Sequence, residues 1–492
     1  SRGLGDVYKR QDFLILEKPD LKEIEALLQN AYQEGFRSVA VVFMHAYAFS
    51  DHEKTVGDIA AEVGFSQISL SHEVMPMVKI VPRGDTTMVD AYLTPHIQKY
   101  LSSFRSGFKD NLKHSELLFM QSDGGLTDSS HFKGSNAILS GPAGGVVGYA
   151  MTSKRGMPVI GFDMGGTSTD VSRYGDDYEL VHETETAGVR IQAPQMHIKT
   201  VAAGGGSRLF FRNGLFEVGP ESAGAHPRPV CYRKGGPLAV TDANLILGRL
   251  NPDYFPKIFG SRQDQPLDRE ASEKALDELT DEINTWGKSH GQKTISREEV
   301  ALGFLKVANE VMIRPIREIS VMRGFDIKEH ALACFGGAAA QHACSLAREL
   351  GIGTIFIHPF AGILSAYGMG LADIVSDNQE TSASVLYQEN TKILLLRLQQ
   401  MEQQEIQTLI SRGHHPDSIV AQSYLNLRYH GTDTALMISK PDDGNFSREF
   451  INTYRREFGF ELKDREILVD DLRVRVMAKS VSYTHLTLPT KA

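Results

Sequence analysis

Cysteine, basic charge and long apolar runs are all scarce in this sequence. Only three cysteines occur in 492 residues, at Cys231, Cys334 and Cys344, and no two of them form a C-x-x-C pair. This pattern argues against a disulfide framework and against a thiolate zinc site, and it favours a reducing compartment, so we expect the cytoplasm. No stretch approaches the roughly 20 apolar residues that a membrane-spanning helix needs, so we expect no membrane partner.

Basic residues are outnumbered, with 52 Lys and Arg against 61 Asp and Glu, for a net charge of -9. Such a balance gives no electrostatic reason to expect a nucleic-acid partner. The hydrophobic share of 41% and the charged share of 23% are ordinary for a globular protein. The length is sufficient for two or three domains with sizeable cores.

The two ends of the chain do not continue the patterns of their neighbours. Segments 1–11 and 480–492 resemble translated sequencing adaptors, and we exclude both from reasoning about the fold. We therefore expect the remainder to be an internal fragment of a longer gene product.

Helical and strand patterns alternate between these ends. Apolar residues at helical spacing predict a helix over 19–36, and the stretch after it reads as a buried strand; this alternation favours an α/β fold. Segment 176–299 differs and reads as an insertion: its first part has short strands broken by Gly and Pro, and its second part is polar. Ser296 and Glu299 form a capping box before a long helix.

The stretch GFDMGGTSTD, residues 161–170, is the most informative motif. A strand ending at Asp163 is followed by Gly165 and Gly166, which allow a turn whose N–H groups converge on one point, as a polyphosphate requires. A carboxylate repels phosphate, so Asp163 makes sense if it holds Mg²⁺ or orients an attacking water. Taken alone, the motif fits a strand-turn-strand hairpin with polar turn residues better than a phosphate loop, and the other stretches of the chain decide between the two.

Three glycine-rich and small-residue stretches accompany this motif. Segment 140–150 predicts a helix of small residues that packs closely on another helix, with Ser140 at its start. Segment 333–352 reads as a strand, the pair Gly336 and Gly337, and a helix. Segment 361–374 predicts a second small-residue helix, with Ala366, Gly368 and Gly370 spaced to face a partner.

The order of these four stretches resembles the actin, sugar kinase and heat-shock-ATPase superfamily. A closer resemblance, over nearly all of residues 12–479, is to the hydantoinase A and oxoprolinase family. It is carried by LSGPAGGVVG, GFDMGGTSTDVSRY, AAGGGS, VANEVMIRPIREISVMRG and FGGAAAQHA. The stretches LNLRYHGTDTALMI and REFGFELKDREILVDDLRVR are most similar to the ATP-hydrolysing 5-oxoprolinases of that family.

The resemblance implies two ribonuclease-H-like α/β lobes that clamp ATP, with paired small-residue helices as the hinge. It divides the chain into the remainder of a first lobe at 12–150, a second lobe at 151–378 with the insertion, and a truncated strand-rich C-terminal domain at 379–479. It also implies an earlier phosphate loop, which this sequence does not contain.

The resemblance assigns ATP and Mg²⁺ to specific residues. Asp163 handles metal or water as the catalytic residue, and Asp170 is a second metal ligand. The residues assigned to the nucleotide form three groups: Gly165, Gly166, Thr167, Ser168 and Thr169 on the outer phosphates, Gly204, Gly205, Gly206 and Ser207 in a second turn, and Gly336 and Gly337 at the adenosine. Arg228 departs from the pattern, because relatives tend to have glycine there.

The implied reaction is ATP-dependent hydrolysis of a cyclic amide, 5-oxo-L-proline to L-glutamate with ATP converted to ADP and phosphate. Phosphorylation of the amide oxygen turns it into a good leaving group, and phosphoryl transfer depends on positioning and charge neutralisation. A hydantoinase B-like subunit or domain is the implied partner in a homo- or hetero-oligomer, and the isolated chain is expected to be inactive.

Other functions remain open from the sequence. A related ATP-dependent hydantoinase or acetone-carboxylase-type subunit would share the same motifs. A non-catalytic scaffold for the hydantoinase B-like partner and a sugar-kinase-like phosphotransferase are alternatives from other classes. The isolated histidines, among them His197 and His342, lack a second ligand at metal spacing and read as structural.

Overall fold

The computed structural model describes residues 15–112, 115–129, 131–153, 156–175, 177–186 and 188–479. The terminal segments 1–11 and 480–492 that the sequence marks as foreign lie outside these residues. The chain divides into two compact units. Unit 1 comprises Ser1–Ser140, Val181–Gln195 and Ala372–Ala492, and unit 2 comprises Gly141–Leu180 and Met196–Leu371.

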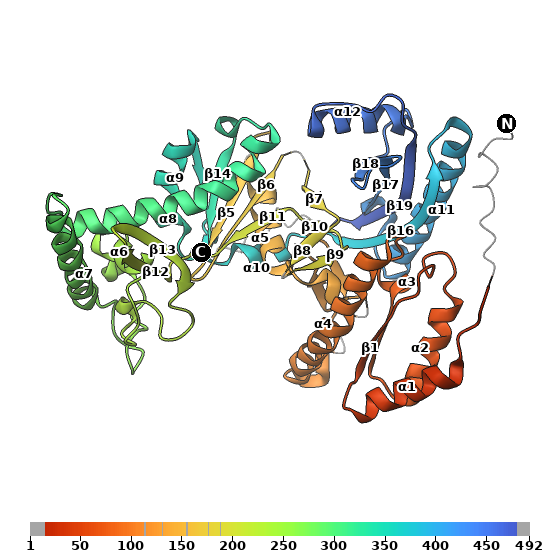
Figure 1. Cartoon of the computed structure of the whole chain (residues 1–492), viewed down its shortest axis with the longest axis horizontal. Helices are drawn as coiled ribbons and strands as arrows, with labels where there is room; N and C mark the ends of the chain where they lie inside the picture. The colour runs from red at the N-terminus through yellow and green to blue at the C-terminus, as the bar shows by residue number, and fades with distance from the viewer. Residues whose placement is uncertain are drawn as a thin grey trace, which may run out of the picture. The chain divides into compact units, whose positions relative to one another are not determined.

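Unit 2 is built on a five-stranded sheet with the order β11-β6-β5-β14-β15. β5, β6 and β11 are antiparallel neighbours, whereas β14 runs parallel to both β5 and β15. Figure 1 shows these strands beside one another, with α8 crossing them. The strands are β5 (Val159–Met164), β6 (Thr169–Tyr174), β11 (Ile198–Val201), β12 (Ser207–Arg212), β13 (Leu215–Ser222), β14 (Ala331–Phe335) and β15 (Thr354–Phe356). Two short strands, β7 (Leu180–Val181) and β10 (Gln195–Met196), each span a point in the sequence where one unit ends and the other begins.

The core of unit 2 lies between this sheet and its longest helix. Alternate residues of β5, including Phe162 and Met164, are buried in the same apolar cluster as Phe304 of α8. The predicted capping box of Ser296 and Glu299 is present at the start of this helix. The helices are α5 (Ser140–Thr152), α6 (Val240–Ile246), α7 (Arg269–Ser289), α8 (Arg297–Ile319), α9 (Ala343–Leu350) and α10 (Leu364–Met369).

Two short small-residue helices, α5 and α10, touch through their backbones. A Cβ atom added to Gly368 would overlap the carbonyl oxygen of Gly144 and lie 2.5 Å from the nitrogen of Gly148. The contact face is made by Leu364 and Gly368, four residues apart. Ala366 and Gly370, expected on the same face, are exposed instead, because residues two apart on a helix point in different directions.

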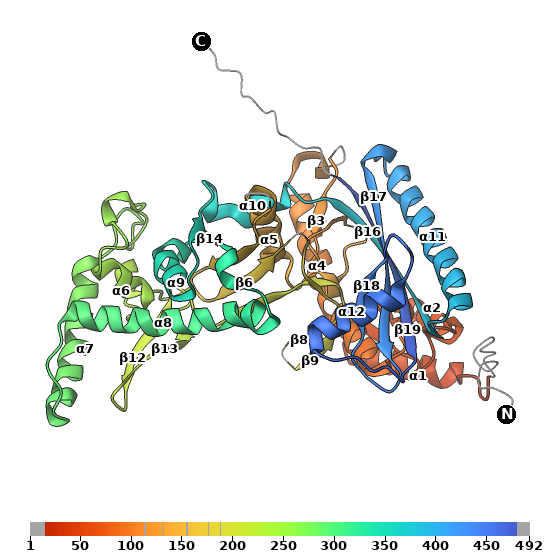
Figure 2. The ribbon, with the colours of Figure 1, turned by 90° about the horizontal axis from the view of Figure 1, so that it is seen from above.

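Unit 1 contains a six-stranded sheet with the order β18-β17-β19-β16-β4-β3 and a two-stranded parallel sheet of β1 and β2. Figure 2 shows α11 lying along the larger sheet, where it packs on β16, β17 and β19. The strands of this unit are β1 (Ser38–Val41), β2 (Gln67–Leu70), β3 (Leu118–Met120), β4 (Leu126–Asp128), β8 (Thr184–Thr186), β9 (Val189–Ile191), β16 (Ile374–Val385), β17 (Ile419–Tyr429), β18 (Leu436–Ser439) and β19 (Ile467–Ala478). Its helices are α1 (Leu21–Gln33), α2 (Asp51–Val63), α3 (Ser71–Val74), α4 (Ile80–Ser106), α11 (Gln388–Ser411) and α12 (Phe446–Phe458).

The central strand β19 has one apolar and one charged face. Leu472, Val474 and Val476 are buried in the apolar cluster that includes α11. Because side chains alternate along a strand, Arg473 and Arg475 project to the opposite face, where both are nevertheless buried. Buried cations of this kind need partners, and unit 1 provides them on neighbouring elements.

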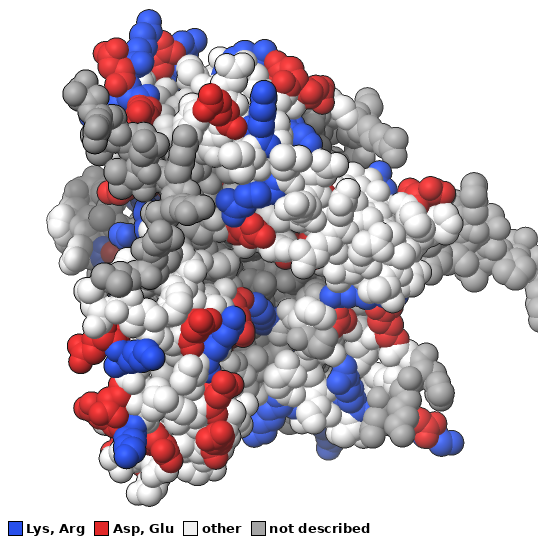
Figure 3. Space-filling model, turned by 90° about the vertical axis from the view of Figure 1, so that its right-hand side faces the viewer, with Lys and Arg blue, Asp and Glu red and all other residues white. Residues whose placement is uncertain are grey.

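Charges of both signs mix over the face drawn in Figure 3, where Lys and Arg alternate with Asp and Glu rather than forming a broad area of one sign. Among the helices that the structure describes, none is long and apolar enough to cross a membrane.

Candidate nucleotide-binding site

The motif at 161–170 folds into a hairpin. Strands β5 and β6 pair in register through Met164 and Thr169, and the N–H of Gly165 donates to the carbonyl of Ser168 at 3.1 Å, closing a turn over 165–168. Gly166 and Thr167 are exposed at the tip of this turn. Thr169 is buried, and its hydroxyl donates to the carbonyl of Ala203 at 2.5 Å. The tip therefore presents backbone groups outward, while Thr169 ties the turn down.

Asp163 and Asp170 are directly opposite each other in this hairpin. Residues at paired positions of antiparallel strands project to the same face. Burial, followed by the charge of Asp170, raises the pKa of Asp163 to about 6. Burial also raises the pKa of Asp170, although the hydroxyl of Thr200 donates to this carboxylate at 2.5 Å. Two carboxylates in this arrangement favour a bound cation between them.

The second glycine turn, 204–207, packs against the first. The N–H groups of Gly205 and Gly206 donate to the carbonyls of Gly165 and Gly166 at 3.0 and 2.6 Å. A Cβ atom at position 204 would lie 2.7 Å from the Gly166 carbonyl carbon and the Thr167 nitrogen. Such separations do not occur for real Cβ atoms, so residue 204 has to be glycine for the two turns to touch. Within this turn, the hydroxyl of the buried Ser207 accepts from the Gly204 N–H at 2.9 Å.

The third segment, Gly336 and Gly337, follows β14 and reaches the same hairpin. Gly336 has a φ of +82°, a conformation that favours glycine, and a Cβ atom there would overlap the Asp163 carboxylate. Two residues later, the N–H of Ala338 donates to the Met164 carbonyl at 2.9 Å. The three glycine segments, far apart in the sequence, thus meet at the β5–β6 hairpin, where Gly336 lies against the carboxylate of Asp163.

Open space adjoins two of these glycines. Cβ atoms added to Gly166 or Gly337 would meet nothing within 4 Å. Glycine at these positions is therefore not explained by packing within the protein, in contrast to Gly204 and Gly336. Space left beside exposed backbone N–H groups is what a bound phosphate requires.

Three residues that support this site belong to none of the motifs that the sequence analysis identifies. Thr200 bonds Asp170 as described above. The hydroxyl and the N–H of Thr241 both donate to the Gly205 carbonyl, at 2.7 and 2.8 Å. Ala338 holds the end of β5. All three act through long-range contacts that no spacing pattern within one segment reveals.

Two histidines of this unit, His342 and His197, have partners within the protein. The buried ring of His342 contacts the amide nitrogen of Asn244 and the amide oxygen of Asn309, and burial lowers its pKa to about 4. His197 lies 3.6 Å from Glu179. Among the described residues, no group of three or more His, Cys, Asp or Glu side chains could hold a metal ion, so any cation near Asp163 and Asp170 needs oxygen ligands from elsewhere, such as phosphate and water.

The fold and the site together define an α/β protein in which glycine-rich turns meet at a hairpin that carries two facing carboxylates. Residues 83–378 match the Hydantoinase/oxoprolinase family and residues 6–64 match the Hydantoinase/oxoprolinase N-terminal region. The chain belongs to the hydantoinase/oxoprolinase family.

Curated relatives give a more detailed comparison. The chain is 52% identical to a 5-oxoprolinase of Dictyostelium discoideum over 96% of this chain and 39% of that protein. It is 50% identical to a 5-oxoprolinase of Saccharomyces cerevisiae over 95% of this chain and 36% of that protein. The chain therefore spans well under half the length of these relatives. The caprolactamase subunit alpha of Pseudomonas jessenii is 33% identical over 84% of this chain and 59% of that protein.

Solved structures confirm the α/β fold. The ATP-dependent caprolactamase from Pseudomonas jessenii is 28% identical, with a TM-score of 0.81 over 96% of this chain and 69% of that chain. A nucleotide-free acetone carboxylase is 21% identical, with a TM-score of 0.70 over 94% of this chain and 67% of that chain, and it shows the fold alone.

Proposed function

We propose that this chain carries the ATP-binding part of an enzyme that opens a cyclic amide, converting 5-oxo-L-proline to L-glutamate while ATP becomes ADP and phosphate. The observation that carries the proposal is the meeting of three glycine segments at the β5–β6 hairpin, with open space beside Gly166 and Gly337. The names of relatives that are 50% and 52% identical add support for the substrate.

We propose the following roles for the residues around the hairpin. The exposed turn residue Gly166, with the side chains of Thr167 and Ser168, cradles the outer phosphates, and Gly165 shapes the turn through its two backbone hydrogen bonds. The turn of Gly204, Gly205, Gly206 and Ser207 holds that cradle in place, as does the bonded hydroxyl of Thr169, and Gly336 and Gly337 leave room for the adenosine.

Magnesium suits the two carboxylates of the hairpin. Asp163 and Asp170 offer the oxygen ligands that this cation prefers, with phosphate oxygens and water completing the set. When bound, Mg²⁺ would neutralise charge on the transferred phosphoryl group. The part of this chain in that chemistry is to hold the phosphates in place and to fix the position of the Asp163 carboxylate through Gly336.

The wider architecture is part of the same proposal. The five-stranded sheet of unit 2 supports one ribonuclease-H-like lobe, with a second in the remainder of the first domain and the α5–α10 contact as a hinge. We propose a hydantoinase B-like subunit or domain as the partner in an oligomer. The name of one relative, caprolactamase subunit alpha, indicates that this relative has more than one kind of subunit, and this supports the proposal. A cytoplasmic location also remains a proposal.

A second candidate is ATP-dependent opening of a different lactam. The likeness to the ATP-dependent caprolactamase, at 28% identity and a TM-score of 0.81, favours it over a sugar-kinase or scaffold role. The higher identity to the 5-oxoprolinases makes 5-oxo-L-proline the first choice.

The test compares two variants of the complete enzyme with its partner present. Asp163→Asn removes a charge without changing shape, so ATP affinity should stay nearly intact while turnover falls about 10²- to 10⁴-fold. Gly166→Val places a branched side chain in the open space beside the turn, so nucleotide affinity should be lost first. Affinity is measured by titration calorimetry, and turnover by coupled ADP and glutamate production.

Gly362→Ala serves as the matched control, because a Cβ atom there also meets nothing within 4 Å but lies away from the hairpin in sequence. It should change neither quantity. Near-normal turnover of Asp163→Asn would show that the motif is a structural hairpin, and the proposed role would be wrong.

A further inference from the structure

Strand β18 forms one edge of the six-stranded sheet of unit 1. On its inner side it pairs antiparallel with β17, and on its outer side no strand in the described part of the chain pairs with it. An open sheet edge presents backbone N–H and C=O groups that can bond another strand, and proteins normally protect or cover such edges.

The ladder between β18 and β17 shows which backbone groups of β18 point outward. The N–H of Lys440, just after the strand, donates to the carbonyl of its pairing partner Ser423 at 2.8 Å. Hydrogen-bonded and non-hydrogen-bonded pairs alternate along an antiparallel ladder, so Ile438 also bonds toward β17. Met437 and Ser439 lie at the pairs between, and their N–H and C=O groups therefore point to the open edge.

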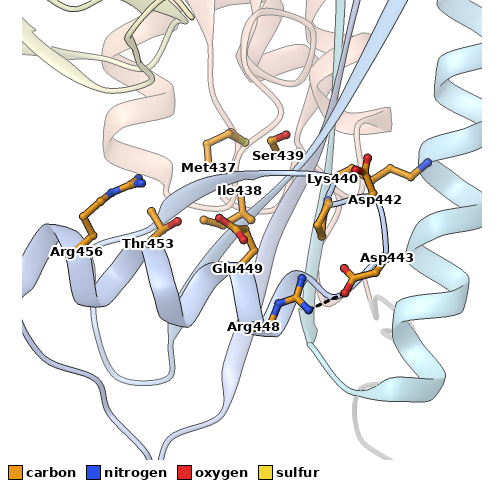
Figure 4. A pocket seen from close by; sticks show the side chains of 11 residues that line it. Met437, Ile438, Ser439, Lys440, Asp442, Asp443, Arg448, Glu449, Thr453 and Arg456 are labelled. Atoms are coloured by element: carbon orange, nitrogen blue, oxygen red, sulfur yellow. Dashed lines mark ion pairs between the residues drawn. The ribbon is translucent and has the colours of Figure 1, made fainter. Parts of the chain in front are cut away.

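A cavity of about 700 Å³ lies beside this edge, between β18 and helix α12 (Figure 4). Three consecutive residues of the strand, Met437, Ile438 and Ser439, contribute to its lining. Because successive side chains of a strand point to opposite faces of the sheet, a cavity that touches all three adjoins the edge of the strand rather than one face. The cavity is thus a groove between a strand edge and a helix.

Helix α12 forms the other wall of this groove. Its buried side packs into the apolar core of unit 1 with Phe446, Phe450 and Tyr454. A different side of the helix lines the groove with Glu449, Thr453 and Arg456, which point toward β18 in Figure 4. These residues follow one another at spacings of four and three, so they form one continuous helical face.

Two charges of opposite sign on this helical face have no partner within the chain. At one end of the groove, Arg448 pairs with Asp443 at 2.8 Å. Neither Glu449 nor Arg456, by contrast, forms an ion pair with any side chain that the structure describes. The seven residues between them correspond to about 10 Å along the helix axis, which is the length of about three residues of an extended chain.

The shape of the groove selects an extended segment that has no helix of its own on the side facing α12. A second copy of this chain does not meet this condition. If two β18 strands paired antiparallel about a two-fold axis, each strand would bring its own α12, which packs on β18, into the groove of the other copy. A single extended segment avoids this overlap.

We propose that the groove between β18 and α12 binds an extended segment from the part of the complete enzyme outside this chain, and that the segment adds to the sheet as a strand beside β18. Relatives named 5-oxoprolinase have more than half of their length outside the part that matches this chain. The inference rests on the proposed function, which makes this chain one part of a larger enzyme. Backbone bonds to Met437 and Ser439 supply the affinity, and a basic and an acidic side chain of the segment face Glu449 and Arg456.

The first experiment compares amide hydrogen exchange in the purified chain and in the complete enzyme with its partner present, without ATP. Mass spectrometry with residue-level fragmentation gives the rate for each amide. We expect the Met437 and Ser439 amides to exchange at least about tenfold more slowly in the complete enzyme, because their N–H groups gain acceptors there. The Ile438 amide, already bonded to β17, is the internal reference. Equally fast exchange of Met437 and Ser439 in both samples would overturn the proposal.

Variants of the complete enzyme test whether an added strand causes this protection. Met437→Pro removes one outward N–H, and proline is tolerated where the N–H of an edge strand faces outward. Thr453→Trp fills the groove, whereas Asn452→Trp is its control, since Asn452 is exposed and does not line the groove. The first two variants should restore fast exchange at Ser439, and Asn452→Trp should leave it slow.

Circular dichroism checks that each variant is folded, and if Met437→Pro does not fold, Thr453→Trp decides. Slow exchange at Ser439 in folded Thr453→Trp would contradict the proposal.

Photo-crosslinking in the purified complete enzyme identifies the segment. Benzoylphenylalanine in place of Thr453 should capture a peptide from outside this chain, and the same group in place of Asn452 should not. Capture of a second copy of this chain, or of no peptide, would show that the proposed occupant is wrong.

The result is separable from the test of the proposed function. Asp163→Asn in the complete enzyme should leave the protection of Met437 and Ser439 unchanged, because Asp163 is in unit 2 and no ATP is present. Failure of the nucleotide site would appear in ATP affinity and turnover, whereas failure of this inference would appear in amide exchange and crosslinking.

Discussion

At the residue scale, the structure explains one departure that the sequence already marks. Arg228 stands where the family resemblance leads us to expect glycine, and its φ is +77°, a left-handed conformation that L side chains rarely adopt. The side chain is exposed, and its Nε donates only to the Ala225 carbonyl at 3.0 Å. The position therefore keeps the backbone conformation of a glycine while holding an arginine.

We expect Arg228→Gly to stabilise the chain by about 0.5–1 kcal/mol. The left-handed conformation costs a non-glycine residue about 1–2 kcal/mol, and glycine avoids this cost. Part of the gain is offset because glycine loses more conformational entropy on folding than arginine does. The measurement is urea unfolding. Arg262→Gly is the control: that arginine is also exposed but has no positive φ, so its replacement should be neutral or destabilising. Destabilisation of both variants to the same degree would contradict the prediction.

A second residue-scale prediction concerns Asp471 on the charged face of β19. Burial raises its pKa to about 6, although Asn426 and Gln379 donate to its two oxygens at 2.9 and 2.5 Å. Because the folded pKa is above the unfolded value, the associated stability is fully present below about pH 3.8 and is lost as pH rises through about 6.

Asp471→Asn removes this ionisable group. The side-chain amides of Gln379 and Asn426 can rotate so that one of them accepts a hydrogen bond from the new amide N–H. The variant should therefore gain stability relative to the parent between pH 5 and pH 8, by up to about 3 kcal/mol. Melting temperatures at four pH values test this. Asp443→Asn is the control, because the pKa of that exposed carboxyl is lowered through the Asn445 N–H and Arg448. If the difference in melting temperature between the parent and Asp471→Asn did not vary with pH, the ionisation of Asp471 would not be its cause.

At the scale of elements, the contact between α5 and α10 is the most constrained packing in unit 2. Carbonyl oxygens of Leu364 and Ser365 approach Gly148 and Gly144 so closely that Cβ atoms on these glycines would lie 2.8 and 2.6 Å away. Backbone atoms cannot move aside as a flexible side chain can, so any larger residue separates the helices.

We expect Gly368→Ala to destabilise the chain by about 2 kcal/mol or more, because the added methyl group would force the two helix backbones apart. Overpacked cores typically cost about 1–3 kcal/mol. Gly362→Ala, next to the same helix but with nothing within 4 Å of the added atom, should change stability by less than about 0.5 kcal/mol. Chemical unfolding of the two variants gives the comparison. A Gly368→Ala variant as stable as Gly362→Ala would mean that the helices do not pack as described.

At the scale of the whole molecule, the chain spans 36% to 39% of the length of relatives named 5-oxoprolinase. Because this chain spans well under half the length of those relatives, we expect weak nucleotide binding and little or no release of glutamate from 5-oxo-L-proline by the purified chain. The complete enzyme, assayed beside it, should release glutamate only with ATP. Strong ATP-dependent release by the chain alone would contradict the proposed division of labour.

The sequence by itself determined the features that depend on local patterns. The predicted helix at 19–36 is present as α1 (Leu21–Gln33), the Ser296 and Glu299 capping box begins α8, and the α/β class and the family are confirmed. Each of these rests on apolar periodicity, on a capping box of four consecutive residues, or on a motif within one segment. The roles of the glycines and of Asp163 stay predictions.

Only the tertiary structure decided which distant residues meet. It brought the turns at 165–168 and 204–207 and the glycines at 336–337 into contact, added Thr200 and Thr241, and put Leu364 rather than Ala366 in the face with Gly368. It also left the buried Nη2 of Arg473, on the charged face of β19, without a hydrogen-bond partner in the described part of the chain. These outcomes follow from long-range packing and backbone exclusion, which no spacing within a single segment records.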